Sequence, residues 1–228
     1  MANHKILTYI IWKRYSICMK KYIPQIVIII SSILLSIFFF QTLPDIMSSH
    51  WNAQGVVNGY SSKLSNILMF PILQIVFFLL LIFIPNLDPK RKNIEKFQKY
   101  FFFFINAFLS FILLLQLQVF LWNIGVQISM AITIPVLIGI LFVLIGQLLK
   151  NAKQNYSIGI RTPWTLASEK VWEKTHKLGA ILFTISGGLS ILSAFLLSYS
   201  FYILVGSVLL STIILVVYSY IEYKHEQI

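Results

Sequence analysis

Long runs of apolar residues, separated by short polar segments, dominate the chain from residue 23 onward. A hydrocarbon core about 30 Å thick needs roughly 20 apolar residues of helix to cross it. Windows of about that length without Asp, Glu, Lys or Arg run over residues 23–43, 64–84, 100–122, 128–149, 178–199 and 201–221. Each run is continuously apolar rather than alternating, which favours helices over barrel strands. The pattern predicts an all-α polytopic protein with a single six-helix membrane domain over residues 1–228.

The composition indicates that the solvent of this chain is lipid. Hydrophobic residues make up 58% of the sequence and charged residues 11%, and the mean hydropathy is +0.82, far from the usage of soluble domains. We expect the first window to remain as a membrane span, because it is longer than the apolar region of a signal peptide and lacks a small-residue cleavage pattern. Cys18 is the single cysteine, which excludes an internal disulfide and a multi-cysteine metal site.

The basic residues are concentrated in one set of connections. Of the 18 Lys and Arg residues, all but Lys63 lie before the first window, in the connection 85–99, in the segment 150–177 or after the last window. Short loops rich in Lys and Arg stay in the cytoplasm. We therefore expect both termini and the segment 150–177 to be cytoplasmic and the segment 44–63 to be an extracellular loop. Nucleic-acid binding is disfavoured, because no basic cluster lies on a soluble domain.

The predicted spans contain no formally charged residue, although ion-coupled transporters normally keep ionisable groups within the membrane. Weaker polar and small residues are present instead, namely Asn106, Gln116, Gln118, Ser186, Gly187, Ser190 and Ser193. We expect these residues to pack helices together, because lipid supplies no hydrophobic force between them. Pro71 and Pro135 interrupt two spans and are expected to kink them. The sequence does not show whether a cavity forms beside either kink.

The outer segment reads LPDIMSSHWNAQGVVNGYSSK and starts with a Leu-Pro pair that ends the first window. Its Asn, Gly and Ser residues favour turns, so we expect a compact irregular loop. Trp51 and Tyr60 suit the boundary between lipid and water, and recognition of an external ligand is the alternative. Asp45 and His50 are too few for a metal site, so no metal is expected.

The inner segment NYSIGIRTPWTLASEKVWEKTH spans residues 155–176 and is unusually polar for its surroundings. Gly159 and Pro163 break regular structure. Ser168 followed by Glu169 predicts the start of a helix with an acidic residue in its first turn. This helix is expected to continue into the span 178–199, so the segment is predicted to be an ordered cap rather than a slack linker.

Two interpretations of this cap remain open. In the first, Arg161 pairs with Glu169 or with a lipid phosphate, Trp164 and Trp172 anchor at the membrane interface, and His176 bonds a carbonyl group. In the second, the same five side chains line a recessed polar site at the cytoplasmic mouth of the bundle. No nucleophile with a positioned base is evident, so we do not expect an enzyme or a cofactor.

At these two segments the sequence resembles a known family. The outer motif is similar to a small domain of unknown function in bacterial membrane proteins. The inner motif resembles the signature of the SdpI family, immunity proteins against the sporulation-delaying-protein toxin. The matching positions are Pro44, His50, Trp51 and Gly55 outside, and Asn155, Gly159, Arg161, Thr162, Pro163, Trp164, Glu169, Trp172 and His176 inside. Asp45 completes the outer set of candidate binding residues.

The resemblance implies a multi-pass protein of the bacterial cytoplasmic membrane that protects its producer by binding a secreted peptide toxin. For some members of the family, the resemblance also implies that the protein signals to a cytoplasmic transcriptional repressor. The partners expected on this basis are the lipid bilayer, the toxin and such a regulator, without direct contact to nucleic acid. The alternative function is a transport or envelope-homeostasis protein of unknown substrate.

Overall fold

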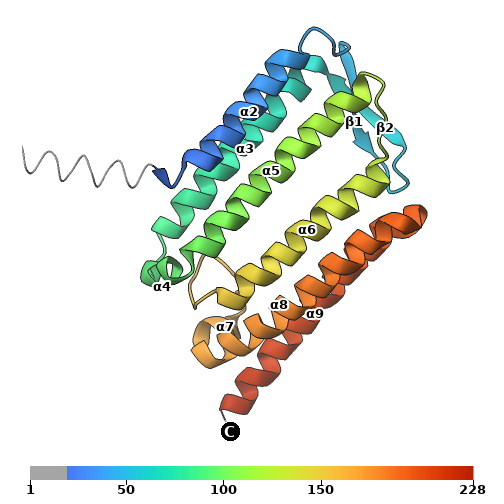
Figure 1. The fold of residues 1–228 in the computed structure, drawn as a ribbon. Coiled ribbons are helices and arrows are strands. Elements are labelled where there is room, and N and C mark those ends of the chain that lie inside the picture. The colour runs from blue at the N-terminus through green and yellow to red at the C-terminus, as the bar shows by residue number, and fades with distance from the viewer. Residues whose placement is uncertain (1–19, 228) are drawn as a thin grey trace, which may run out of the picture.

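The computed structural model describes residues 20–227 (Figure 1). Cys18 and the basic residues before residue 20 lie outside this range. The elements in chain order are α2 (Ile23–Phe39), β1 (Ile46–Trp51), β2 (Val57–Ser62), α3 (Lys63–Asn86), α4 (Arg91–Lys96), α5 (Gln98–Asn123), α6 (Met130–Asn151), α7 (Pro163–Ala167), α8 (Glu169–Ser193), the 3₁₀ helix η1 (Ala194–Tyr199) and α9 (Ser200–Glu226).

Apolar helices of membrane-crossing length make up most of the described chain. Within residues 20–227, four continuous helical stretches are long and apolar enough to cross a membrane, namely Lys63–Asn86, Gln98–Asn123, Met130–Asn151 and Glu169–Glu226, and α2 is a shorter apolar helix of 17 residues. The last stretch bends at η1, where Leu196 and Leu197 leave helical φ and ψ values. As a result α8 and α9 lie side by side (Figure 1), with Ser186 Oγ 2.9 Å from Ser211 Oγ. The protein is therefore a mostly helical polytopic membrane protein.

The first group of helices, α2, α3 and α5, is joined by buried polar side chains. Ser32 Oγ donates to Gln116 Oε1 at 2.5 Å, and Gln116 Nε2 donates to Ser36 Oγ at 2.8 Å. Ser36 Oγ in turn donates to the carbonyl oxygen of Ile67 on α3 at 2.9 Å. Buried polar groups need such partners, since an unpaired one is costly away from water. The predicted packing role of Gln116 is confirmed.

The second group of helices, α6, α8 and α9, is held by close backbone contact. A Cβ atom placed on Gly139 of α6 would lie only 2.7 Å from the carbonyl oxygen of Gly187 on α8. Nearby, Ser190 Oγ donates to the carbonyl oxygen of Pro135 at 2.8 Å. The packing roles expected for Gly187 and Ser190 are thus confirmed, whereas the importance of Gly139 became visible only in the structure.

The outer segment is a β-hairpin, so the prediction of an irregular loop was wrong, and the chain is mostly rather than entirely helical. β1 and β2 pair antiparallel, with Met47 opposite Ser61. The turn forms because Asn52 Oδ1 accepts from the backbone N–H of Val56 at 2.9 Å and Gly55 adopts a φ of +76°. The residues that suggested irregularity are the ones that build a tight hairpin turn. Side-chain bonds from Asn123 to the backbone of β1 fix the hairpin to the end of α5.

The hairpin and the inner cap occupy opposite ends of the helical layer (Figure 1). The hairpin end carries Lys63, whose Nζ lies 3.2 Å from an Asp45 oxygen. The start of α2, the helices α4 and α7, and the end of α9 gather at the other end, together with the remaining basic residues of the described chain. The charge asymmetry read from the sequence is therefore also an asymmetry in space.

Candidate functional site

The inner cap is built around His176 and Trp172, which are 2% and 1% exposed in the first turns of α8. Ser168 starts this helix by accepting a hydrogen bond from the backbone N–H of the third residue along, as predicted. The His176 Nε2 atom accepts from the Ile160 backbone N–H at 3.0 Å. Its Nδ1 atom lies 2.8 Å from the carbonyl oxygen of Trp172. A backbone N–H can only donate, so the imidazole is neutral with its proton on Nδ1.

Burial explains the electrostatics of this pair. It lowers the pKa of His176 to about 4, partly opposed by the hydrogen bond to the Trp172 carbonyl. The expectation that His176 bonds a carbonyl group is confirmed. The expectation that Trp172 anchors at the membrane interface was wrong, because its indole is buried and Nε1 donates to the carbonyl oxygen of Ala152 at 3.0 Å.

Gly159 lies directly against His176 and Trp172, and only glycine fits at this position. Its φ of +121° is one that other residues rarely adopt. A Cβ atom at this position would collide with His176 Nε2 and would lie 3.1 Å from ring carbons of Trp172. The backbone passes so close to the imidazole because the N–H of the adjacent Ile160 donates a hydrogen bond to His176 Nε2.

Asn155 shapes the loop that precedes Gly159. Its side chain is fully buried. Oδ1 accepts from the backbone N–H groups of Ser157 at 2.8 Å and Ile158 at 2.6 Å, and Nδ2 donates to the carbonyl oxygens of Lys153 at 2.8 Å and Ile158 at 2.9 Å. This is the turn chemistry for which Asn is favoured. The segment is an ordered cap, as the sequence indicated.

Asp88, in the turn between α3 and α4, holds this loop from the other half of the molecule. Its Oδ2 accepts from the Tyr156 N–H at 2.8 Å and from Ser157 Oγ at 2.6 Å, while Oδ1 accepts from the Lys90 N–H at 2.7 Å. Gln154 adds a second link, because its carbonyl oxygen accepts from the side chain of Asn93 at 2.8 Å. Sequence reasoning missed both residues. The only available signal was an acidic residue followed by proline in a basic connection.

The next residues dock the cap onto α9. Thr162 caps α7 and donates from Oγ1 to Ser219 Oγ at 3.1 Å. Pro163 follows at the first helical position, where its missing N–H costs nothing. The ring of Trp164 packs against that of Tyr220, with centroids 5.1 Å apart. Thr162 and Trp164 therefore contribute to internal packing, and Pro163 helps to start α7.

Arg161 and Glu169 lie exposed on the surface of the cap. Arg161 Nη1 donates to the carbonyl oxygen of Tyr156 at 2.6 Å. The predicted pairing of Arg161 with Glu169 is not among the ion pairs of residues 20–227. The structure thus separates the side chains that the second interpretation placed in one recess, since Trp172 and His176 are enclosed while Arg161 and Glu169 face outward.

The outer candidates are also divided. Asp45 pairs with Lys63, and His50 Nδ1 lies 2.5 Å from Asn58 Oδ1 across the hairpin. Pro44 is exposed just before β1. Within the described range, no group of three or more His, Cys, Asp and Glu residues is placed to hold a metal ion.

A cavity of about 420 Å³ opens between the hairpin, α6 and α9. The indole of Trp51 forms part of its wall and packs edge-on against Trp122, with ring centroids 5.5 Å apart. Pro135 and Ile138 line the α6 side, and Leu204 lines the α9 side. A second cavity, of about 600 Å³, lies beside Pro71 between α2 and α3. Both prolines singled out in the sequence therefore border a cavity.

The fold and these sites define a polytopic helical membrane protein with a β-hairpin at one end and an internally bonded cap at the other. Residues 151–219 match the SdpI/YfhL protein family, and residues 27–75 match a domain of unknown function, DUF1648. The chain is 30% identical to the immunity protein SdpI of Bacillus subtilis (strain 168) over 207 aligned residues. This alignment covers 90% of this chain and 97% of that protein. No solved structure matches it significantly. The chain belongs to the SdpI family.

Proposed function

We propose that this protein is an immunity protein of the bacterial cytoplasmic membrane, which protects its producer by binding a secreted peptide toxin. The observation that carries the proposal is the similarity to the immunity protein SdpI over nearly the full length of both chains. In the proposed topology six helices cross the membrane, both termini are cytoplasmic and the hairpin is outside. The clustering of basic residues at the end opposite the hairpin supports that orientation.

The cavity beneath the hairpin is the proposed binding place for the toxin. A secreted peptide reaches the outer face first, and the cavity wall there is largely apolar, with Trp51, Ile134, Ile138 and Leu204 among its residues. Burying one large apolar side chain of a peptide is worth about 1.5 to 3 kcal/mol. Insertion of two or three such side chains would supply useful affinity without any charged partner.

Expression in a toxin-sensitive host tests this proposal. The wild-type chain is expected to raise survival under the toxin of a producing strain, and Ile138→Trp is expected to abolish protection by filling the cavity. Ile140→Trp is the matched control, because Ile140 lies on the same helix but is 45% exposed and outside that wall. Failure of the wild-type chain to protect against a panel of producer peptides would remove support for immunity. Equal protection by both variants would place toxin binding elsewhere.

The topology can be tested separately by thiol labelling of intact cells in a Cys18→Ser background. A membrane-impermeant maleimide is expected to label Tyr60→Cys in the exposed face of β2 and to leave Lys170→Cys unlabelled until the cells are opened. Both positions are exposed in the structure. Labelling of both in intact cells would contradict the proposed orientation.

We assign the inner cap two functions within this proposal, a structural lock and a docking surface for a cytoplasmic regulator. The lock is supported by the internal bonds of Asn155, Thr162 and His176. Arg161 and Glu169 are the candidate residues whose charged side chains are exposed to a partner. An Arg161→Ala, Glu169→Ala variant is expected to retain protection but to lose capture of a repressor from the producer strain. Unchanged capture would exclude these two side chains from docking.

A further inference from the structure

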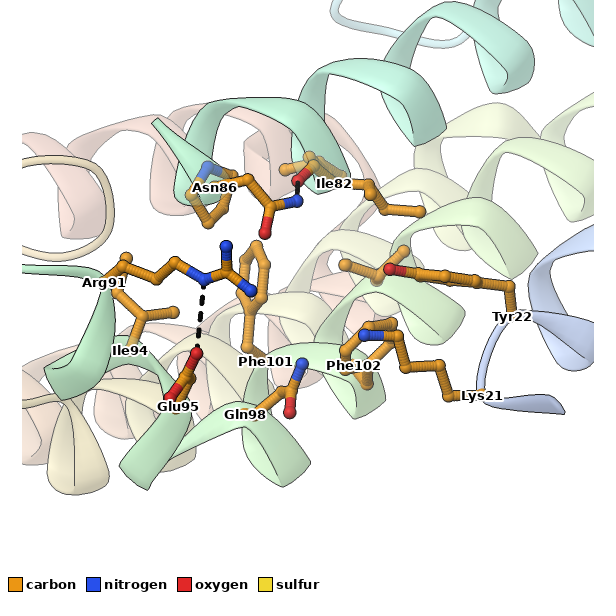
Figure 2. Close-up of a pocket in the computed structure, with 13 residues that line it drawn as sticks. Lys21, Tyr22, Ile82, Asn86, Arg91, Ile94, Glu95, Gln98, Phe101 and Phe102 are labelled. Carbon is orange, nitrogen blue, oxygen red and sulfur yellow. Dashed lines mark hydrogen bonds and ion pairs between the residues drawn. The ribbon is translucent and has the colours of Figure 1, made fainter. Parts of the chain in front are cut away.

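A cavity at the cap end of the molecule combines cationic and apolar walls. It has a volume of about 260 Å³ and lies between the start of α2, the end of α3, α4 and the start of α5 (Figure 2). Lys21 and Arg91 border it on opposite sides, and the aromatic rings of Tyr22, Phe101 and Phe102 form much of its wall. None of these residues belongs to the inner motif or to the cavity beneath the hairpin.

Lys21 is an exposed cation without a carboxylate partner in the described chain. Its Nζ lies 4.8 Å from the ring centroid of Tyr22 and 5.5 Å from that of Phe102, within the range of cation–π attraction. Among residues 20–227, no carboxylate is within ion-pair distance of it. The preceding segment 1–19 contains neither Asp nor Glu. Its ammonium group is therefore free to pair with an anion.

Arg91 supplies the second cation. Its Nε bonds Glu95 Oε1 at 3.2 Å. Figure 2 shows the two terminal nitrogens of the guanidinium directed away from Glu95, toward Asn86 and the centre of the cavity. The rim thus carries two cations against one carboxylate. A guanidinium in this position can donate two hydrogen bonds to a phosphate group.

An apolar groove adjoins the cationic cavity. It has a volume of about 520 Å³ and follows α2 and α3, where Ile26, Phe78, Leu79 and Phe83 are among its lining residues. Tyr22 and Ile82 line both spaces, so the cavity and the groove share a wall. Leu79 and Phe83 are 58% and 61% exposed, as expected for side chains that contact hydrocarbon.

We propose that the cavity and the groove together bind one anionic phospholipid, with its phosphate between Lys21 and Arg91 and one acyl chain along the groove. The cavity lies where α2 and α5 begin and α3 ends, which is the head-group level for helices that cross a bilayer. Basic pockets between membrane helices recognise anionic head groups. A free phosphate would leave the groove unused, and a neutral lipid would leave the net positive charge of the rim unbalanced.

Native mass spectrometry of the full-length protein in detergent tests the site, with phosphatidylglycerol and phosphatidylcholine as probes. The wild-type chain is expected to retain one phosphatidylglycerol selectively. The Lys21→Gln, Arg91→Gln variant is expected to bind it about fivefold more weakly for each cation removed. The matched control is Lys92→Gln, Lys99→Gln, which removes the same charge from exposed positions outside the cavity wall. Equal loss in both variants, or no loss in the first, would overturn the proposal.

Two further measurements identify the ligand and guard against misfolding. Leu79→Trp fills the groove without changing charge, and it is expected to weaken phosphatidylglycerol retention while leaving the elution volume of the protein unchanged. If the double variant fails to fold, this variant decides the question, and unchanged retention then overturns the proposal. Inorganic phosphate is expected not to displace the lipid; displacement at millimolar phosphate would identify an anion site instead. The test uses no toxin, so its result is independent of the immunity proposal.

Discussion

The imidazole of His176 stacks on the indole of Trp172, with ring centroids 3.9 Å apart and 18° between the ring planes. Trp172 belongs to a buried cluster that includes Phe97 of the α4–α5 connection and Leu148 of α6. The stack therefore connects the cap to both groups of helices. Because Gly159 covers the imidazole from the loop side, the buried residues of the inner motif form one packed unit.

Acidification is expected to destabilise the protein through His176. Above its ordinary pKa of 6.5 the imidazole is neutral in both the folded and the unfolded chain. As the pH falls toward the folded-state pKa of about 4, the unfolded chain binds a proton that the folded chain does not. The free energy of unfolding then decreases by up to about 3 kcal/mol, which thermal unfolding at pH values above and below this range would measure.

Two variants separate this group from other titrating groups. His176→Gln removes the titration, so its stability should vary less with pH over the same range, although it is lower at neutral pH. His225→Gln alters an exposed histidine near the end of α9 and should preserve the wild-type pH dependence. A wild-type slope in the His176→Gln protein would contradict the assignment.

Gly159→Ala is expected to lower the free energy of unfolding by at least about 2 kcal/mol, because it combines backbone strain at positive φ with a collision against His176. Gly188→Ala is the control. A Cβ atom there has no heavy atom within 4 Å, and alanine raises helix propensity. Thermal unfolding followed by size-exclusion chromatography compares them. Equal stability of the two variants would show that the cap tolerates a side chain at residue 159.

Asp88→Asn is expected to loosen the inner loop. One side-chain oxygen becomes an amide that faces a donor, which leaves a buried group unpaired at a cost of about 1 to 3 kcal/mol. Trypsin should then cleave faster after Arg161, since the loop is held by Asp88 through Tyr156 and Ser157. Glu169→Gln changes an exposed carboxylate of the same cap and should leave the cleavage rate unchanged. A similar rate in all three proteins would argue against Asp88 as the anchor.

Gly139→Ala is expected to weaken the contact between α6 and α8. The added methyl group meets the backbone of Gly187, which cannot rotate away. Overpacking costs about 1 to 3 kcal/mol, and the gain in helix propensity offsets up to about 1 kcal/mol of it. Gly206→Ala, where the new group meets open space, should be neutral or stabilising in the same thermal assay. Stabilisation of both variants would mean that the helices separate easily.

Features that depend on residues close together in the sequence were predictable from the sequence. The apolar windows located the helices, and the Ser168 cap marked the start of α8. The bond from His176 to a carbonyl group and the packing roles of Gln116 and Ser190 also followed, because buried polar groups in an apolar environment must find partners. The hairpin was missed, since turn-forming residues are as common in irregular loops as in tight β-turns.

Contacts between distant segments were decided by the tertiary structure alone. Asp88 reaches Tyr156 because the ends of α3 and α6 meet at one end of the layer, and no pattern of apolar residues specifies that meeting. The burial of Trp172 and the shared wall at Tyr22 arise in the same way. The sequence by itself determined which segments are helical and which end is basic, because hydrophobicity and charge act locally. Which side chains share a core or a cavity depends on how the helices pack.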